Sequence, residues 1–237
     1  MIRSLIREML ITEMTSPTAI AAEQGMALFT IGDPKSHGKV IIYDPNLLLQ
    51  QVRQARRFSR DADPKEVIVD SIDTEPIVRA GVTLWHDTDG QCNGSGIVGR
   101  AASVAGSRMG PAAYEAAMWL ANGLTSDRKE TSRAAGMVWG KYADRASNGE
   151  IDALPFDDVS DPQTPPPEDD CELQDRDWLN SSYHLKSKPP GLDEMMSNHK
   201  KAASAVARFG LEESVLKWKL DQLFMMLFDE RMSEDEA

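Results

Sequence analysis

Short apolar runs and longer runs of helical period follow one another along this chain. Apolar or alternating stretches predict β-strands at residues 26–31, 39–43, 66–72, 77–86, 94–105 and 181–188. Apolar positions spaced three and four residues apart predict helices at 2–11, 46–60, 112–122, 131–146, 192–208 and 211–230. Because the strands come early and mostly adjacent while the helices come late, the pattern indicates an α+β fold.

Charge divides the chain into three segments. Residues 152–177 hold ten acidic residues and one arginine, and so carry −9 of the net charge of −12. With three consecutive prolines at 165–167, this stretch predicts an acidic loop or linker. We therefore expect a body at 1–150, the acidic proline-rich segment at 151–180, and a C-terminal strand with a helical extension at 181–237. The acidic total argues against general nucleic-acid binding, which depends on neutralising phosphates.

The cysteines and the start of the chain bear on its compartment. Cys92 and Cys171 are too few for a disulfide framework, and a reducing compartment is the simplest interpretation. Arg3 and Arg7 interrupt the first apolar run, so we expect no secretory segment. No apolar run is long enough to span a bilayer. These features favour a soluble cytoplasmic protein with no membrane partner.

The stretch GSRMGPAAYEAAMWLANG, residues 106–123, places small residues where a predicted strand turns into a helix. The first N–H groups of a helix lack partners within it and lie at the positive end of its dipole, so this turn could cradle a phosphate. Gly110 and Ala112 remove bulk that would keep a phosphate away, and Pro111 suits the first helical position. An ordinary strand-to-helix connection is the alternative interpretation.

The run 97–123 resembles the acetyl-CoA binding unit of the GNAT acetyltransferase superfamily. That family carries Gln/Arg-x-x-Gly-x-Gly/Ala between its fourth strand and the following helix. Here the pattern falls on residues 107–112, where Gly110 and Ala112 match and Ser107 takes the first place. A short GLTSD and a second helix ending in VWGKY follow, as the family's fifth strand and fourth helix do. The resemblance covers residues 25–146 and implies a GNAT-like mixed central sheet flanked by helices.

The same resemblance implies an acetyl-CoA-dependent N-acetyltransferase that acts on a protein lysine or a small amine. It would place the cofactor's pyrophosphate and pantetheine arm against Ser103, Val104, Ala105, Ser107, Arg108, Met109, Gly110, Ala112 and Ala113. The pyrophosphate would meet the amides of Met109, Gly110, Ala112 and Ala113, and the pantetheine arm would pair with the strand edge at 103–105.

Tyr142 is the candidate acid that protonates the departing thiolate after an amine attacks the thioester. The competing interpretation is a core tyrosine on the same apolar face as Trp139. No base stands out; Glu75 and Glu115 qualify by residue type only.

A second resemblance suggests a different role. The stretches MIRSLIREML and GLTSDRKETSRAAGMVWGKYADR are similar to small bacteriophage proteins. A phage protein would work in the host cytoplasm or belong to the virion, and it could use the same fold to bind and modulate a host enzyme without catalysis. The apolar positions of the helices at 2–11 and 211–230 suit a homodimer or host-protein interface, or packing onto the protein's own core.

Two further clusters have open interpretations. Arginines at 53, 56, 57 and 60 form a stripe that could hold the 3′-phosphate of CoA or an acidic partner, or could be a solvated helix face. His86, Asp87, Asp89 and Cys92 could suggest a metal, although the tip of a hairpin explains them more simply.

Overall fold

The structure is a computed structural model that describes residues 16–58, 70, 72, 77–86, 91–128, 131–160, 162–163 and 169–235. The predicted helix at 2–11 lies outside these residues, as do most of the predicted strand at 66–72 and residues Glu75, Asp87 and Asp89.

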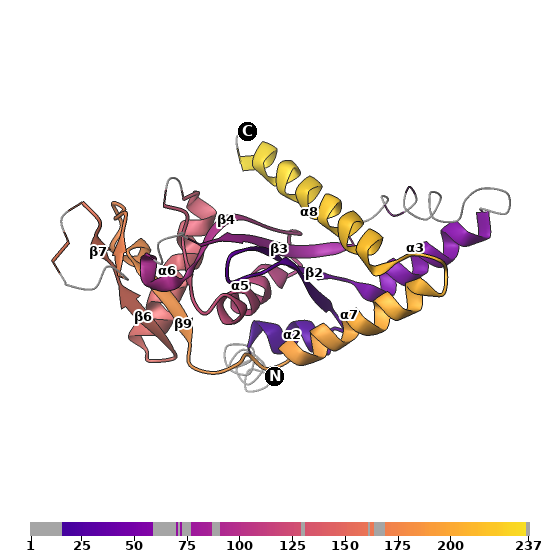
Figure 1. The fold of residues 1–237 in the computed structure, drawn as a ribbon, viewed down its shortest axis with the longest axis horizontal. Coiled ribbons are helices and arrows are strands. Elements are labelled where there is room, and N and C mark those ends of the chain that lie inside the picture. The colour runs from indigo at the N-terminus through magenta and orange to yellow at the C-terminus, as the bar shows by residue number, and fades with distance from the viewer. Residues whose placement is uncertain are drawn as a thin grey trace, which may run out of the picture.

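The centre of the protein is a seven-stranded sheet (Figure 1). Its strands are β1 (Ala27–Gly32), β2 (His37–Tyr43), β3 (Val78–Trp85), β4 (Gly96–Ser103), β5 (Leu124–Thr125), β6 (Ile151–Pro155) and β9 (Ser181–Leu185), in the spatial order β1-β2-β3-β4-β5-β9-β6. Neighbouring strands are antiparallel except β4 and β5, which are parallel. The predicted α+β class is therefore confirmed as a mostly antiparallel sheet flanked by helices.

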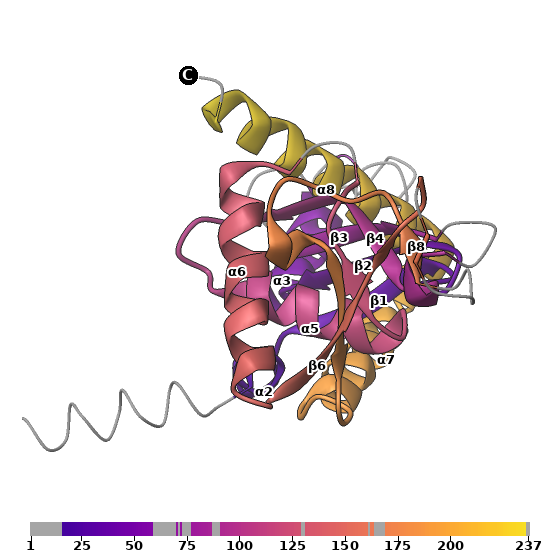
Figure 2. The ribbon, with the colours of Figure 1, turned by 90° about the vertical axis from the view of Figure 1, so that its left-hand side faces the viewer.

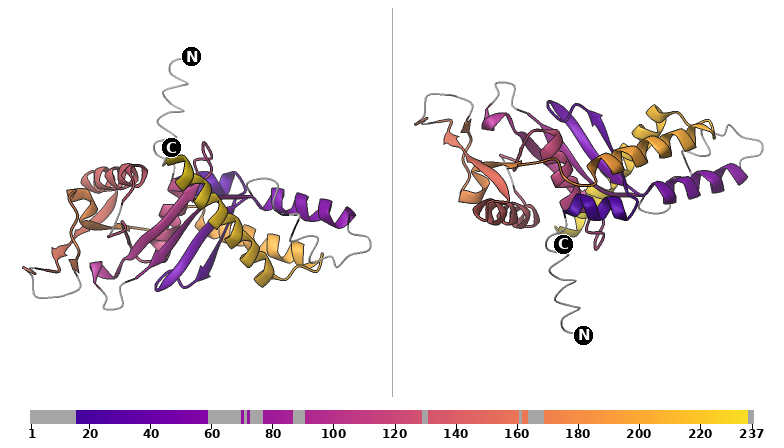
Figure 3. Two further views of the ribbon diagram at one scale, coloured as in Figure 1. Left: turned by 90° about the horizontal axis from the view of Figure 1, so that it is seen from above. Right: turned by 90° about the horizontal axis from the view of Figure 1, so that it is seen from below.

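Two hydrophobic clusters cover the two faces of this sheet. On one face, α2 (Pro17–Glu23), α5 (Met109–Leu120) and α6 (Arg133–Ser147) pack around side chains such as Val82 and Leu84 of β3. On the other, α3 (Pro45–Phe58), α7 (Leu192–Ala207) and α8 (Glu213–Asp235) contribute to a second cluster with Phe29 and Ile41. Figure 3 shows α8 crossing the sheet, and Figure 2 shows α6 beside the sheet at the end where β6 lies.

The packing of α8 depends on a glycine in the sheet. A Cβ atom at Gly81 of β3 would lie 2.6 Å from Cδ2 of Phe224, so the phenyl ring rests directly on the strand. Leu216, Leu220 and Phe224 are fully buried. The sequence left open whether the apolar residues of this helix form an interface or pack onto the core. These three residues pack into the protein's own core.

The acidic segment contains more structure than a linker. Residues 151–155 form the edge strand β6, and β7 (Asp157–Asp158) pairs in parallel with β8 (Asp170–Cys171). A short 3₁₀ helix, η2 (Asp177–Leu179), then leads into β9, which lies between β5 and β6. Residues 152–155 of the predicted loop or linker are therefore strand, because backbone pairing with β9 outweighs their acidic composition, and residues 157–158 pair with 170–171.

The two cysteines are joined. Cys92 lies in the 3₁₀ helix η1 (Cys92–Gly94) just before β4, and it forms a disulfide with Cys171 of β8, 79 residues away in sequence. The sequence favoured reduced cysteines, and the structure corrects this expectation. The fold brings together two residues that spacing alone could not pair.

Candidate functional site

One edge of β4 is unpaired over most of its length in the described part of the chain. Strand β4 pairs with β3 from Ile97 to Ser103, but it pairs with β5 only at Gly96 and Ile97. Beyond Ile97, no strand of the described residues bonds to the β5 side of β4. The register shifts at the β3–β4 pairing, so that Gly99 is left between paired residues, and Gly99 and Arg100 are exposed. Unpaired strand edges offer backbone N–H and C=O groups to a binding partner.

A tight turn connects this open edge to helix α5. The Val104 carbonyl accepts hydrogen bonds from the Ser107 amide at 3.1 Å and from Ser107 Oγ at 2.7 Å. Gly106 has a φ of 71°, in the region that favours glycine, and Arg108 has a φ of 58° just before the helix. Two left-handed residues thus reverse the chain within the turn, and α5 begins close to the end of β4.

Gly110 lets the helix approach the strand. A Cβ atom there would lie 3.1 Å from Ser103 Oγ, closer than ordinary van der Waals contact. The absence of a side chain at this position therefore has a packing reason. It also leaves the Gly110 amide uncovered by any side chain of its own.

The helix begins earlier than the sequence predicted, and this changes which amides are free. Because α5 starts at Met109, Ala112 and Ala113 are its fourth and fifth residues, whose N–H groups the helical pattern directs to carbonyls four residues back. The Met109 amide donates to Ser107 Oγ at 3.3 Å. Of the four amides that the sequence predicted as phosphate donors, the Gly110 amide is the one that takes part neither in the helical pattern nor in the bond to Ser107. The exposed Arg108 side chain lies two residues before it.

Tyr142 is buried in an aromatic cluster. Its ring centroid lies 5.9 Å from that of Trp139, 6.3 Å from Tyr114 and 6.1 Å from Tyr183. The side chain is 4% exposed, and burial, followed by the charge of Glu115, raises its pKa well above the usual value. The hydroxyl therefore stays protonated at neutral pH, as an acid must. Its packing on the same face as Trp139 fits the core interpretation, and the catalytic role stays a prediction.

Glu115 has a structural environment. This α5 side chain is almost fully buried, and its carboxylate accepts hydrogen bonds from Ser16 Oγ at 2.7 Å and Arg145 Nη1 at 3.0 Å. Thr18 Oγ1 donates to it at 3.3 Å. These contacts join α2, α5 and α6 through one carboxylate. They also occupy the oxygen atoms that a catalytic base would need, a role for which Glu115 qualified by residue type only.

A polar cluster near the start of β4 had no signal in the sequence. His184 Nε2 lies 2.9 Å from Ser182 Oγ and 3.4 Å from Ser95 Oγ, while Asn93 Nδ2 donates to Ser182 at 3.2 Å. Burial lowers the pKa of His184, so its ring is neutral near pH 7. Ser95 and Ser182 are also buried, which favours a structural role for this cluster. Its members lie about ninety residues apart in sequence, beyond the reach of a local motif.

The histidine and cysteine that suggested a metal have other partners. His86 Nε2 is 2.8 Å from the Pro34 carbonyl, and Cys92 is in the disulfide. Among the residues that the structure describes, no group of three or more His, Cys, Asp or Glu side chains could hold a metal ion.

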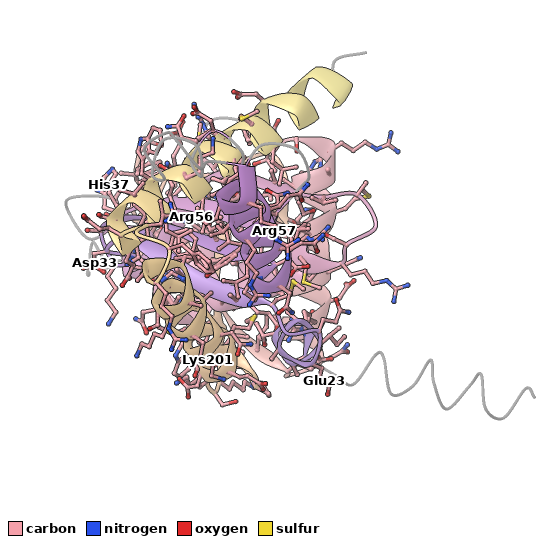
Figure 4. All side chains as sticks on the ribbon, turned by 90° about the vertical axis from the view of Figure 1, so that its right-hand side faces the viewer. Glu23, Asp33, His37, Arg56, Arg57 and Lys201 are labelled. Carbon is pink, nitrogen blue, oxygen red and sulfur yellow. A yellow bond between two sulfur atoms is a disulfide. The ribbon has the colours of Figure 1, made fainter. Side chains whose placement is uncertain are left out.

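The arginine stripe lies on the outer surface of α3. Arg53, Arg56 and Arg57 are exposed, and Arg60 lies outside the described residues. Arg56 and Arg57 are labelled on this helix in Figure 4. A depression of about 560 Å³ is lined by Asn46, Leu49, Gln50, Arg53, Gln54 and Arg57, all from α3. The stripe thus remains a candidate contact for an anionic group.

Comparison with known proteins identifies no relative. No protein-family model matches the chain, and neither the curated proteins nor the solved structures contain a match. No helix among the described residues is long and apolar enough to cross a membrane.

Proposed function

We propose that this protein binds acetyl-CoA along the open edge of β4 and transfers the acetyl group to an amine. The observation that carries the proposal is the parting of β4 from β5 after Ile97, with the start of α5 at the far end of the open edge. The open edge supplies backbone groups for an amide-rich arm, and the helix start supplies an N–H and a positive dipole end for a diphosphate.

The order of elements supports a GNAT-like body. The only parallel pair among the described strands of the sheet is β4–β5, and α5 connects the two strands. Helix α6 follows β5, in the same succession of strand, helix, short strand and helix that the sequence resemblance rests on. A short strand β5 leaves most of β4 open, which a wedge-shaped ligand site requires.

The proposed contacts follow from this geometry. The pantetheine arm would lie along residues 98–103 of β4 and meet Val104 and Ala105 at the turn. The pyrophosphate would accept hydrogen bonds from the Gly110 amide and lie near the hydroxyls of Ser103 and Ser107, with the Arg108 guanidinium as its counter-charge. The site therefore depends on fewer helix amides than the sequence predicted, and more on Arg108.

The proposed reaction needs one proton donor. A neutral acceptor amine attacks the thioester carbon, the carbon–sulfur bond breaks, and the CoA thiolate takes a proton. Tyr142 remains our candidate donor because of the sequence resemblance; its raised pKa keeps the hydroxyl protonated but also makes it a weaker acid than an exposed tyrosine. A Tyr142→Phe variant that binds acetyl-CoA normally and loses at least about tenfold in transfer rate would support this role. An unchanged rate would assign Tyr142 to the core alone.

Calorimetry with acetyl-CoA tests the proposed site. A Gly110→Val variant places bulk at the helix start, and we expect it to weaken binding at least about tenfold, the worth of one charge-assisted hydrogen bond. Gly140→Val is the matched control, because Gly140 lies on α6, where an added Cβ atom would have no neighbour within 4 Å. Absence of binding to the wild-type chain at millimolar acetyl-CoA would end the proposal.

A second candidate function is docking to a host protein without catalysis. The specific observation is the exposure of Trp218 and Met226 on α8, with 54% and 51% of their surfaces accessible. They lie eight residues apart on one helix face, with exposed Gln222 between them. Trp218→Asp together with Met226→Asp should abolish capture of a host partner in a pull-down, while Gln222→Glu serves as the control on the same face. Full capture by the double variant would reject this surface.

A further inference from the structure

Arg128 is a buried cation with neutral contacts. Only 7% of the residue is exposed, and its guanidinium donates to the carbonyls of Ser126 at 3.0 Å and Leu179 at 2.8 Å. Further donations go to Thr125 Oγ1 at 3.0 Å, Ser126 Oγ and the Glu172 carbonyl at 3.4 Å. Among the described residues no carboxylate forms an ion pair with it. Burial lowers the pKa of Arg128 to about 10, while the charges of Asp127 and Glu172 act in the opposite direction.

The disulfide lies at this cation. Nη1 of Arg128 is 4.0 Å from Sγ of Cys171, and its Cζ atom lies 5.3 Å from the centre of the Phe156 ring. Cys92, Cys171 and Ile97 form a small buried cluster with Trp85 and Phe156 packed against it. The side chain that would become an anion on reduction therefore lies next to this buried positive charge.

The two sulfurs have different surroundings. Cys171 is fully buried, whereas Cys92 is 4% exposed and lies in the short turn η1 beside the exposed Gly94. Cys92 and Asn93 both have left-handed φ angles, of 56° and 57°, which non-glycine residues rarely adopt. Cys92 thus lies nearer to solvent than Cys171 does, in a turn whose backbone is left-handed at two consecutive residues.

We propose that Cys92–Cys171 is a redox-active thiol-exchange site, in which a dithiol reductant attacks Cys92 and Cys171 leaves as a thiolate beside Arg128. In the first step the reductant's thiolate forms a bond to Cys92 Sγ, the Cys92–Cys171 bond breaks, and its electron pair remains on Cys171. The reductant's second thiol then loses its proton and displaces Cys92 from the mixed disulfide. The reductant becomes a cyclic disulfide, and the protein gains two electrons and the protons.

The charge of Arg128 decides the direction of this exchange. A neighbouring guanidinium lowers the pKa of a cysteine, while burial among apolar groups and a nearby carboxylate raise it. Arg128 therefore acts on Cys171 against its full burial and against the buried Asp170, its neighbour in β8. A thiol with a lower pKa leaves faster and stabilises the reduced state. Exchange at this disulfide does not depend on whether the protein binds acetyl-CoA.

The first experiment measures the pKa of each cysteine separately. In a Cys92→Ser variant we expect Cys171 to titrate at least one unit below about 8.5, as followed by ultraviolet thiolate absorbance across pH. In the matched Cys171→Ser variant we expect Cys92 to titrate at or above that value. A Cys171 pKa at or above about 8.5 would overturn the proposal.

The second experiment uses the intact pair, so that the proposal is tested even if a single-cysteine variant fails to fold. The fraction of disulfide is measured in graded mixtures of reduced and oxidised dithiothreitol. Arg128→Met should shift the equilibrium toward the disulfide by at least about tenfold, equivalent to about 30 mV, while Arg128→Lys should shift it less. If Arg128→Met and the wild type are half reduced in the same dithiothreitol mixture, the cation has no role in the exchange and the proposal is overturned.

Discussion

Replacing Glu115 with glutamine tests whether this buried carboxylate holds three helices together. The change keeps the size of the side chain and removes its charge. It also places an amide donor among groups that already donate, namely Ser16, Thr18 and Arg145. At least one of those donors loses its acceptor, so the folded state loses free energy relative to the unfolded state.

The structure sets the size of the loss. Breaking a buried ion pair from one side costs about 3–5 kcal/mol when both charges are enclosed. Here the Glu115 side chain is 3% exposed, but Arg145 is 31% exposed and keeps a contact with Glu150. Solvent and that second contact compensate part of the loss, so we expect a decrease of about 2 kcal/mol in the free energy of unfolding. For a chain of this size, that corresponds to a fall in Tm of about 4–8 °C.

Urea unfolding and calorimetry measure this change. Glu150→Gln is the matched control, because it removes the exposed carboxylate that contacts the same arginine and should cost less than about 0.5 kcal/mol. A Glu115→Gln variant within about 0.5 kcal/mol of the wild type would refute the structural role. If such a variant also lost acetyl transfer, Glu115 would instead belong to the catalytic machinery.

Two further predictions concern pH and packing. Burial lowers the pKa of His199, whose Nδ1 lies 3.0 Å from the Tyr43 hydroxyl, so the folded state favours the neutral ring. The free energy of unfolding should therefore be constant just above about pH 6.5 and fall as the pH drops through the folded-state pKa; His199→Gln should reduce this slope in urea titrations. Gly81→Ala should lower stability by about 1–3 kcal/mol, because the new methyl group displaces Phe224 from β3. Gly140→Ala, with open space at its Cβ position, should instead raise it by up to about 1 kcal/mol in the same assay, and equal effects of the two changes would contradict this packing.

The sequence predicted the helices and strands that have a clear local hydrophobic pattern. Alternation and apolar runs located the strands that became β1, β2, β3, β4 and β9, and helical spacing located α3, α5, α6, α7 and α8. Strand β6 was missed because Asp152 and its neighbours look like a solvated linker. Its strand state comes from backbone pairing with β9, which composition does not encode.

The sequence predicted where the strand meets the helix, but it did not predict which backbone amides at the start of α5 are available as donors. Small residues at 106–112 indicated a close approach of strand and helix, and Gly110 does face Ser103. The start of α5 at Met109 was predicted three residues too late, which is the common uncertainty of helix ends. That shift places Ala112 and Ala113 inside the helical bonding pattern. A difference of three residues therefore reduced the expected set of amide donors.

The pairs that join distant segments could not be predicted at all. Cys92 and Cys171, and likewise Arg128 and the Leu179 carbonyl, meet because the segment before β9 folds back over the start of β4. No spacing rule relates them, since their separation is set by the path of the chain rather than by the period of a helix or strand. The redox proposal thus depends on the structure, whereas the acetyl-CoA proposal began with the sequence.

The most direct test of the central claim is a crystal structure of the protein grown with CoA. The account predicts a diphosphate within hydrogen-bonding distance of the Gly110 amide, with the Arg108 side chain turned toward it. It also predicts a pantetheine arm bonded to the edge of β4 between Val98 and Ser103. A CoA molecule bound elsewhere, or crystals that stay empty at this edge under saturating CoA, would contradict it.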